Sequence, residues 1–466
     1  MTDLPRFDRR MSDAEALMWR MDKDPYLSST FCNITLLDRA PDTDRLRRRL
    51  DRATRVVPRL RQRVQSVPGN LTPPMWVDDP NFDLQYHVRH ISLPKPGTMR
   101  QLLDLAALIT SDPFDRTRPL WQFVVVDGIR GGKSALVQKL HHAIIDGEAG
   151  VKLSMQFLDL EREAPEPPPL GPEFDDLVAE DAATANDPYG DGDLLRELLS
   201  GTFRLPLGLL RHIKDLLADP GGIHGAGADA ARTLREIVQQ VSDTETAQSP
   251  LWTARSLHKR IEILRTPFAA TNAAAKRLGG TLNTAFVTAA ADAAGRYHRA
   301  LGAPVEHLRT SMVVSTRTEH SGSNAFSLAR LVVPTGEMSA AERFTAIQNA
   351  TADARSSTSG SSVEAIAALT TTLPTSIVTR LGRQQTQTID FATSNVKGAP
   401  FPLYVAGAKV LQNHPVGPLM GVAFNLTLLS YDGSLDMGVN IDTAAVSDPE
   451  LLRTCLEQAF TAFQKA

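Results

Sequence analysis

The chain has 466 residues, of which 42% are hydrophobic and 22% are charged, which is ordinary for a globular protein with a large core. Its formal net charge of −3 gives the chain as a whole no preference for nucleic acid. The two cysteines, Cys32 and Cys455, are too few for a disulfide framework, so we expect a reducing cytoplasm. Neither a secretory signal nor a run of about 18 apolar residues occurs, so any membrane contact should be peripheral.

The first elements of the chain can be placed from local signals. Ser12 and Glu15 form a capping box, which predicts a helix that begins at Asp13. Apolar runs and alternating patterns predict strands over residues 31–37, 82–90, 121–126 and 134–140.

Residues 43–64 are dense in arginine. Leu46, Leu50 and Ala53 recur at helical spacing, so the segment begins as an amphipathic helix that ends before Pro58. Its arginines are expected either to bind anionic lipid headgroups or the phosphates of CoA, or to form a solvated face balanced by neighbouring acids. The second interpretation is favoured, because most charge runs form such a face.

The glycine-rich stretch Gly131-Gly132-Lys133-Ser134 resembles the end of a phosphate-binding loop. That loop needs a further glycine at position 127, where Asp127 stands. A strand follows where the loop would need a helix, so we interpret the stretch as a hairpin turn between two strands.

The second strand of this hairpin leads into the motif H-H-x-x-x-D-G, formed by His141, His142, Asp146 and Gly147. Imidazole can take up and return a proton near neutral pH. Adjacent histidines at a strand end point to opposite faces, so only one of them can face a given cleft. Gly147 permits a backbone geometry that a side chain would forbid.

Two other chemistries are weighed at this motif. A metal site is possible in principle, but adjacent strand histidines do not easily reach one ion and no third ligand is obvious. An acyl-enzyme hydrolase is unsupported, because the chain contains no G-x-S-x-G and no serine or cysteine nucleophile stands beside the histidines.

The composition of the middle of the chain predicts a connection between two halves. A helix is predicted after Gly147 and ends near Glu161, and residues 162–192 are rich in proline and acids, as in a linker. Residues 194–217 are rich in leucine with interspersed arginine, which fits either an interfacial lipid-binding helix or a crossover packed on the other half. We therefore divide the chain into residues 1–161, 162–248 and 249–466.

The second half also mixes strands and helices. Leu426 to Ile441 alternate around Asp432-Gly433, which predicts a hairpin. Further strands are predicted at 257–264, 311–316 and 328–333, and helices at 266–278, 281–299, 338–356, 362–381 and 448–464. Two α/β halves joined by a long connection suggest a substrate channel between them.

The H-H-x-x-x-D-G motif resembles the signature of the CoA-dependent acyltransferase superfamily. Other stretches resemble one branch of it, the bacterial wax ester synthase/diacylglycerol acyltransferase family. They are Met11-Ser12-Asp13-Ala14, residues 82–90, Pro119-Leu120-Trp121, Ser394-Asn395-Val396 with Pro402-Leu403-Tyr404 and Gly407-Ala408, and residues 425–433.

This resemblance implies an α/β fold of two chloramphenicol-acetyltransferase-like subdomains with a central channel. It implies transfer of a long fatty acyl group from acyl-CoA, which is a substrate, to diacylglycerol or a long-chain alcohol, with no metal and no cofactor. It assigns His142 as the general base, His141 as its support, and Asp146 and Gly147 to the shape of the loop. The expected partners are these substrates and a membrane or lipid-droplet surface, with no nucleic acid.

We expect Asn395, Asn283 and Trp121 to bind substrate. Asn395 is a candidate donor to the oxyanion, and the alternative is a structural role for its side chain. The chain departs from the family at Thr284, where an aspartate is usual, and at Lys397, where a proline is usual. These departures leave two alternatives: a non-catalytic lipid-surface protein that kept the fold, and an acyltransferase for a specialised alcohol or amine.

Overall fold

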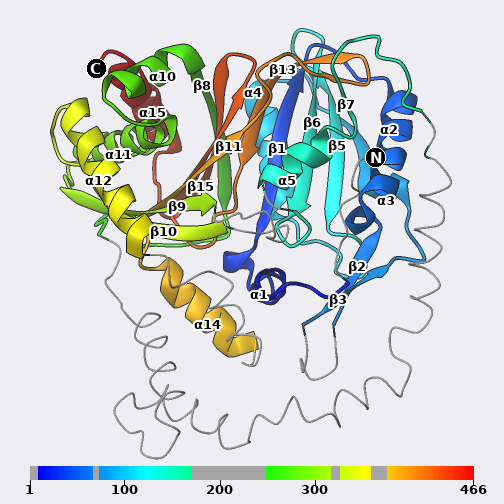
Figure 1. The fold of residues 1–466 in the computed structure, drawn as a ribbon, viewed down its shortest axis with the longest axis horizontal. Helices are drawn as coiled ribbons and strands as arrows, with labels where there is room; N and C mark the ends of the chain where they lie inside the picture. Colours follow the sequence, from blue (N-terminus) through cyan, green and yellow to red (C-terminus); the bar gives the residue numbers. More distant parts are fainter. Residues whose placement is uncertain are drawn as a thin grey trace, which may run out of the picture. The chain divides into compact units, whose positions relative to one another are not determined.

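The computed structural model describes residues 9–66, 73–145, 147–168, 170, 248–315, 326–357 and 375–466. The chain divides into two compact units, residues 1–168 with 245–466, and residues 169–244. All but Leu170 of the second unit lies outside the described residues, including the predicted leucine-rich segment 194–217. Everything below concerns the first unit, which contains two mixed sheets (Figure 1).

The first sheet has seven strands, and most of them come from the first part of the chain. Its central pairs β5–β6, β6–β1 and β1–β13 are antiparallel, whereas β4 and β5 run parallel. In spatial order the strands are β4 (Val88–Ser92), β5 (Trp121–Ile129), β6 (Lys133–His141), β1 (Thr30–Leu37), β13 (Ala408–Val416), β12 (Tyr404–Val405) and β7 (Leu158–Asp159). A separate small sheet pairs β2 (Gln62–Gln65) with β3 (Met75–Asp78).

The second sheet has six strands and uses only the C-terminal part of the chain. In spatial order they are β10 (Phe326–Pro334), β9 (His307–Ser315), β11 (Phe391–Lys397), β14 (Phe424–Tyr431), β15 (Ser434–Asp442) and β8 (Lys259–Pro267). The predicted hairpin is β14–β15, whose turn holds Asp432 at a φ of 41° and Gly433 at a φ of 78°. Positive φ is the geometry that a two-residue hairpin requires.

Helices cover both sheets. The helix predicted from the capping box is α1 (Asp13–Met21), and Ser12 and Glu15 form the box as expected. The others are α2 (Thr43–Val56), α3 (Leu84–His87), α4 (Met99–Ser111), α5 (Gly147–Ser154), α10 (Phe268–Arg277), α11 (Leu282–Ala300), α12 (Ala340–Ser357), α14 (Thr375–Thr386) and α15 (Pro449–Gln464), with short turns η1 (Pro25–Leu27) and η2 (Pro58–Leu60). No helix in the described ranges has the length and apolar content needed to cross a membrane.

Strand β13 ties the two sheets together. It pairs with β1 of the first sheet, although it lies between β11 and β14 in the sequence. Its edge away from β1 meets the second sheet, where the backbone N–H of Asn413 donates to the Asp436 carboxylate at 2.7 Å. Asn440 Nδ2 also donates to the carbonyl of Gly417 at 2.9 Å. The C-terminal half predicted from the sequence therefore contributes β12 and β13 to the first sheet, so a simple linear boundary does not describe the sheets.

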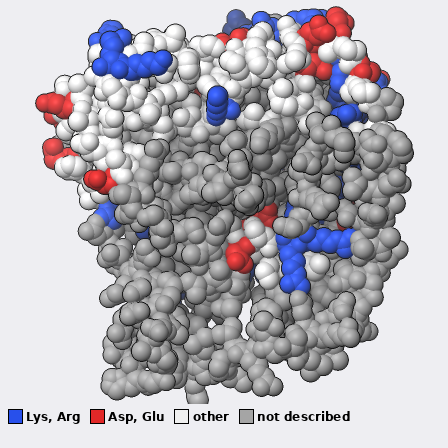
Figure 2. All heavy atoms as spheres, viewed as in Figure 1, with Lys and Arg blue, Asp and Glu red and all other residues white. Residues whose placement is uncertain are grey.

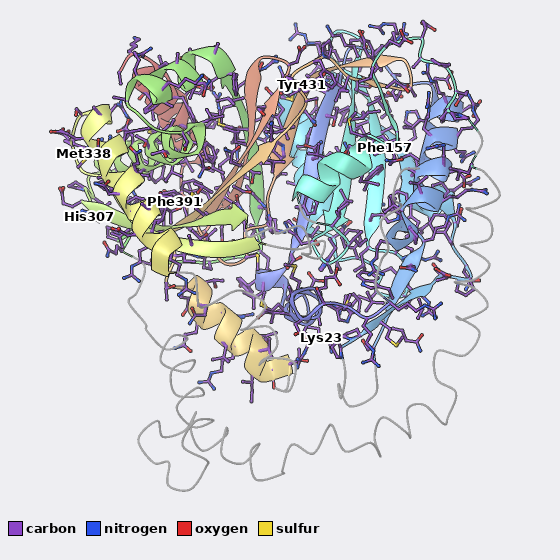
Figure 3. All side chains as sticks on the ribbon, in the orientation of Figure 1. Lys23, Phe157, His307, Met338, Phe391 and Tyr431 are labelled. Carbon is purple, nitrogen blue, oxygen red and sulfur yellow. The ribbon has the colours of Figure 1, made fainter. Side chains whose placement is uncertain are left out.

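Each sheet has its own apolar core. Phe391 and Phe424 stack in the core between the second sheet and its helices, with ring centroids 5.0 Å apart. A second core lies on one face of the first sheet and contains Phe123, Phe157 and Tyr431. Because Tyr431 belongs to β14, the second sheet contributes to that core, and Figure 3 labels Phe157, Phe391 and Tyr431.

The structure corrects several sequence predictions. Residues 84–87 form a short helix, so the predicted strand 82–90 is reduced to β4, because Asp83 caps the helix through the N–H of Gln85. The helix after Gly147 ends at Ser154 rather than near Glu161, and residues 158–159 pair with β12 instead. Strands β2, β3, β7, β11, β12 and β13 were not predicted, whereas the mixed α/β class is confirmed.

The arginines of α2 are largely neutralised by nearby acids, which is the favoured interpretation of that segment. Arg45 and Arg49 both pair with the buried Asp159, at 2.8 and 2.9 Å. Arg48 pairs with Glu166 at 2.8 Å. Figure 2 accordingly shows basic and acidic side chains together at the upper right of the molecule. The contacts hold residues 159–166 against α2.

Candidate active site

The two histidines of the motif lie where β6 ends. His141 pairs with Thr30 of β1, and the backbone N–H of His142 donates to the carbonyl of Ser29 at 3.2 Å. The chain then turns, because the N–H of Ile144 donates to the His141 carbonyl at 3.0 Å. The turn leads into α5, which begins at Gly147 and contacts β11 of the second sheet. The motif is thus held between strands of both sheets.

His141 is completely buried, and its neighbours determine its tautomer. The backbone N–H of Ala143 donates to His141 Nδ1 at 3.0 Å, so in the neutral ring the proton is on Nε2. That nitrogen is 3.5 Å from Asp22 Oδ1, and the Asp22 side chain is only 13% exposed. Burial alone would raise the pKa of Asp22, but the interactions with His141, Ser28 and Arg116 hold this pKa below its ordinary value. The Asp22 carboxylate therefore lies beside the Nε2 side of the His141 ring.

His142 points to the other face, as strand alternation predicts. Its ring is partly buried and lies 4.5 Å from the Phe31 ring, centroid to centroid. Burial lowers the pKa of His142 to about 4, and His141 acts in the same direction, while the Ile145 carbonyl opposes them. A ring with this pKa is neutral at physiological pH and can accept a proton. His142 has the protonation state that a general base requires.

The remaining motif residues are placed only in part. Asp146 lies outside the described residues, so its structural role stays a prediction. Gly147 is the first residue of α5, and its loop-shaping role also stays a prediction. No group of three or more histidines, cysteines or acids that could hold a metal ion occurs in the described ranges, and these ranges exclude Asp146.

Asn283 and Asn395 are brought together by the fold, although 112 residues separate them. Asn395 Nδ2 lies 3.4 Å from Asn283 Oδ1, and Asn283 is at the start of α11. The neighbour Val396 packs against the core on the first sheet, so alternation directs Asn395 to the opposite side of β11. Asn395 is exposed at the end of β11.

Trp121 lies in the core rather than on an open surface. Its indole is 1% exposed and donates from Nε1 to the carbonyl of Leu60 at 2.8 Å. His87 stacks on it at 4.6 Å, and burial lowers the pKa of His87 to about 4. A substrate contact by Trp121 stays a prediction. Trp121 belongs to β5, which pairs with β6, the strand that leads to His142.

The two residues that depart from the family pattern, Thr284 and Lys397, lie in α11 and in β11 of the second sheet. Thr284 is buried in the first turn of α11, where its N–H and hydroxyl meet the hydroxyl of the capping residue Thr281 at 3.2 and 3.0 Å. Lys397 is exposed at the end of β11. Neither residue is part of the hydrogen bonds that position His142.

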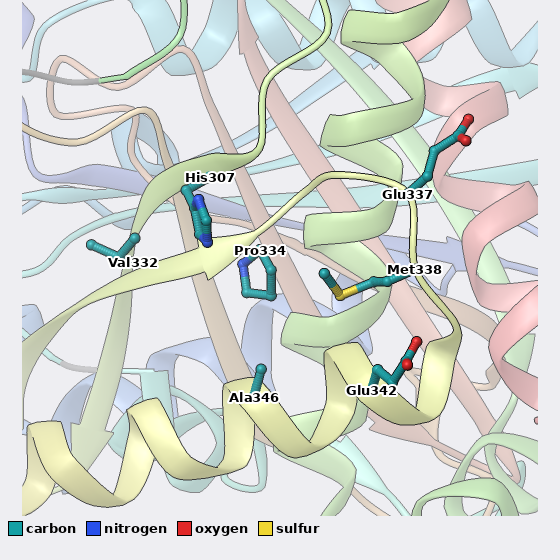
Figure 4. Close-up of a pocket in the computed structure, with 7 residues that line it drawn as sticks. All are labelled: His307, Val332, Pro334, Glu337, Met338, Glu342 and Ala346. Carbon is teal, nitrogen blue, oxygen red and sulfur yellow. The ribbon is translucent and has the colours of Figure 1, made fainter.

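A hollow of about 700 Å³ lies elsewhere, between β10 and α12 (Figure 4). Its walls carry His307, Glu337 and Glu342 beside Val332 and Met338. None of the residues predicted for the active site lines it. The hollow is therefore separate from the histidines at the end of β6.

Comparison with known proteins identifies the family of the chain. Residues 11–286 match the model of the wax ester synthase/diacylglycerol acyltransferase catalytic domain, and residues 322–464 match the C-terminal domain of the same family. The chain belongs to this family. A Mycobacterium tuberculosis protein named as a proposed diacylglycerol O-acyltransferase is 33% identical, over 98% of this chain and 92% of that protein. A second such protein from the same organism is 28% identical, over 94% and 93%.

Solved structures share the fold of this family member. The wax ester synthase/diacylglycerol acyltransferase of Marinobacter aquaeolei superposes with a TM-score of 0.65 and 20% identity, over 98% of this chain and 99% of that one. The starter condensation domain of rhizomide synthetase, in complex with C8-CoA, superposes with a TM-score of 0.57 and 14% identity, over 98% and 94%. The resemblance inferred from the motifs is confirmed, and the protein is an acyltransferase of this family.

Several residues that build the site were missed by the sequence analysis. Asp22 and Phe31 contact the two histidines, yet both lie more than a hundred positions earlier in the chain. The strand 31–37 was predicted, so alternation could have placed Phe31 on one face. Nothing in the local sequence around Asp22 indicates its pairing with His141.

Proposed function

We propose that the protein transfers a long-chain acyl group from acyl-CoA to the hydroxyl of diacylglycerol or of a long-chain alcohol. The observation that carries the proposal is the neutral, partly buried His142, held at the end of β6 beside α5 and β11 in a chain of this family. The named activities of the relatives and the C8-CoA complex of a fold neighbour support the choice of substrates.

The reaction then needs no covalent enzyme intermediate. His142 takes the proton of the acceptor hydroxyl while the oxygen attacks the thioester carbonyl. A tetrahedral oxyanion forms and collapses, the carbon–sulfur bond breaks, and the CoA thiolate receives the proton from the imidazolium. Proton uptake and return by one group leave the enzyme unchanged after each cycle.

The developing oxyanion needs a donor, and Asn395 is our candidate for it. Its amide is exposed at the end of the strand that α5 contacts, and Asn283 restrains it. Replacing an oxyanion donor costs about 10²–10³ in kcat, whereas replacing a restraint costs less. Asn395→Ala should therefore lower kcat much more than Asn283→Ala, and equal small losses would contradict this role.

The acceptor and the product are almost entirely apolar, so we propose that the enzyme works at a lipid surface. The surface would be a membrane or a lipid droplet, contacted peripherally. The leucine-rich residues 194–217 are the candidate contact, and they lie outside the described residues.

The decisive experiment is a product screen. The full chain is incubated with palmitoyl-CoA and a mixture of diacylglycerol, hexadecanol and simple amines, and the lipids are analysed by mass spectrometry. We expect triacylglycerol or wax ester with the wild type and neither with His142→Ala. Amide products, or esters that persist in the variant at the wild-type rate, would contradict the proposal.

A further inference from the structure

Four polar side chains continue from His142 along one face of the first sheet. They are Asn33 and Thr35 of β1, Gln138 of β6 and Asn413 of β13, and we call them the polar row. Asn33 is directly opposite Gln138, and Thr35 is directly opposite Asn413. Directly opposed residues present their side chains on the same face.

The face of the polar row is also the face of His142. Phe31, whose ring lies 4.5 Å from the His142 ring, is two residues before Asn33 on the same strand. Two residues along a strand correspond to about 7 Å, and their side chains share a face. Asn33, the first residue of the row, is therefore the next side chain after Phe31 on this face of β1.

The second sheet also borders this region. The backbone N–H of Asn413 donates to Asp436 of β15 at 2.7 Å. Leu140, which is opposite Phe31, shares its core with Leu429 of β14. The row therefore lies where the strands of the two sheets approach each other.

The members of the polar row are hydrogen-bonded to one another. Asn33 Nδ2 donates to Thr35 Oγ1 at 3.1 Å and to Asn413 Oδ1 at 2.5 Å. Thr35 Oγ1 donates to Asn413 Oδ1 at 2.9 Å, and Gln138 Nε2 donates to Thr35 Oγ1 at 3.1 Å. These contacts hold the four groups in fixed positions.

The same contacts leave part of the hydrogen-bonding capacity unused. Asn33 Oδ1, Gln138 Oε1 and Asn413 Nδ2 make no hydrogen bond to any residue that the structure describes. Thr35 and Gln138 are buried, while Asn33 and Asn413 are partly exposed. The row thus offers two acceptors and one amide donor, and the donor has hydrogens to spare.

The two acceptors and one donor of the polar row match only one part of the substrates in the proposed reaction. A secondary amide offers one N–H donor and one carbonyl acceptor, and the pantetheine arm of CoA carries two such amides in sequence. Acyl chains and the tail of a fatty alcohol offer neither group. Diacylglycerol has ester acceptors and a single hydroxyl that must reach His142. The arm is therefore the substrate part that matches the row.

We propose that the polar row binds the amides of the pantetheine arm, so that the acyl donor approaches His142 along β1. The inference rests on the proposed function for its choice of ligand. The first amide of the arm is separated from the thioester sulfur by two methylenes. The thioester can then lie beside Phe31 and His142 while the amides lie against Asn33 and Asn413.

The test compares donors that differ only in their amides. Asn33→Ala and wild type are assayed with palmitoyl-CoA, palmitoyl-N-acetylcysteamine, which keeps one amide, and palmitoyl-ethanethiol, which has none. We expect Asn33→Ala to raise the KM for palmitoyl-CoA about five- to tenfold with little change in kcat. The effect should be smaller with N-acetylcysteamine and absent with ethanethiol, and the KM of the acceptor should not change.

Two controls separate binding from damage to the fold. Gln122→Ala removes an amide from the opposite face of the same sheet, since Gln122 follows Trp121 on β5, and it should leave every KM unchanged. Melting temperatures identify a variant that is merely destabilised, and Asn413→Ala provides a second, partly exposed position. An equal rise in KM for the amide-free donor, a rise for the acceptor, or no change in either variant would overturn the inference.

A binding measurement keeps this test independent of turnover. Calorimetric titration with free CoA should show Kd raised about five- to tenfold in Asn33→Ala relative to wild type and Gln122→Ala. If the wild type binds CoA through Asn33 but forms no ester, the proposed function fails while the subsite stands. If the wild type forms ester and Asn33→Ala binds CoA normally, the subsite fails while the function stands.

Discussion

The two faces of the first sheet differ although they share the same strands. On the face of His141, the side chains next to the motif are buried: Lys139 is 2% exposed, donates to the carbonyl of Asp112 at 2.6 Å and lies over the Phe114 ring. Cys32 is fully buried on the same side, and burial raises the pKa of its thiol to about 11. On the face of His142, the imidazole is only partly buried and polar atoms remain without partners among the described residues.

The contrast shows how adjacent residues divide their tasks. Strand alternation sends His141 into the closed face, where Asp22 and the backbone define its position, and sends His142 into the face that meets the second sheet. Buried polar groups that are held by close neighbours make a rigid support. In our proposal, the groups without partners on the other face bind the substrate. Substitutions on the two faces should therefore separate activity from stability.

The largest effect is expected for His142→Ala. Loss of a general base usually costs about 10²–10⁴ in rate. The ring is only partly buried, so the melting temperature should change little. Steady-state ester formation and thermal unfolding measure both effects. A fully active variant would show that another group takes the proton.

His141→Ala should reduce stability more than activity. It removes a completely buried ring, the acceptor for the Ala143 N–H, and the neighbour of the Asp22 carboxylate. We expect a loss of about 2–3 kcal/mol in the free energy of unfolding. Activity should fall less than in His142→Ala once the protein is folded. Denaturant unfolding monitored by fluorescence checks this, and an unchanged midpoint would contradict it.

Asp22→Asn keeps the shape of the side chain and removes its charge. The pKa of Asp22 is held below its ordinary value, so its ionised form stabilises the fold above a pH of about 4 and this contribution is lost as the pH falls further. The variant should lose about 1–2 kcal/mol at neutral pH. Its deficit relative to wild type should shrink in acid. A deficit that stays constant from pH 7 to pH 3 would show that the charge is not involved.

The pH dependence of wild-type activity tests the lowered pKa of His142. Because the pKa of His142 is lowered to about 4, kcat/KM should stay level above a pH of about 5 and fall below it. The unfolded ring has a pKa of about 6.5, so neutral His142 favours the fold above that value, and this contribution is lost as the pH falls through 6.5 toward 4. A kinetic pKa near 6.5 would contradict the lowered pKa of His142. The contribution of His142 to stability is measured as the difference in the free energy of unfolding between wild type and His142→Ala at each pH.

The smallest effect is expected for Trp121→Phe. The substitution removes the hydrogen bond to Leu60 and part of the stack on His87, which should cost about 1 kcal/mol of stability. KM for acyl-CoA and for the acceptor should stay close to the wild-type values. A selective rise in either KM would support the predicted contact between Trp121 and substrate.

Local chemistry made much of the fold predictable. The capping box of α1 and the hairpin at Asp432-Gly433 depend on neighbouring residues, and both were predicted correctly. Strand β1 was predicted from its apolar run. Strands β11 and β13 were missed, because a polar stretch such as Thr393-Ser394-Asn395 becomes a strand only when distant strands, here β9 and β14, supply its partners.

The sequence by itself determined the family, the motif and the opposite orientation of its two histidines, because these depend on residue identity and on the two-residue period of a strand. Only the tertiary structure decided which distant residues surround them. Asp22 and Phe31 reach the two histidines through packing and strand pairing, and strand β13 joins the first sheet from the C-terminal part of the chain. Such contacts arise from the burial of whole faces, which no short stretch of sequence encodes.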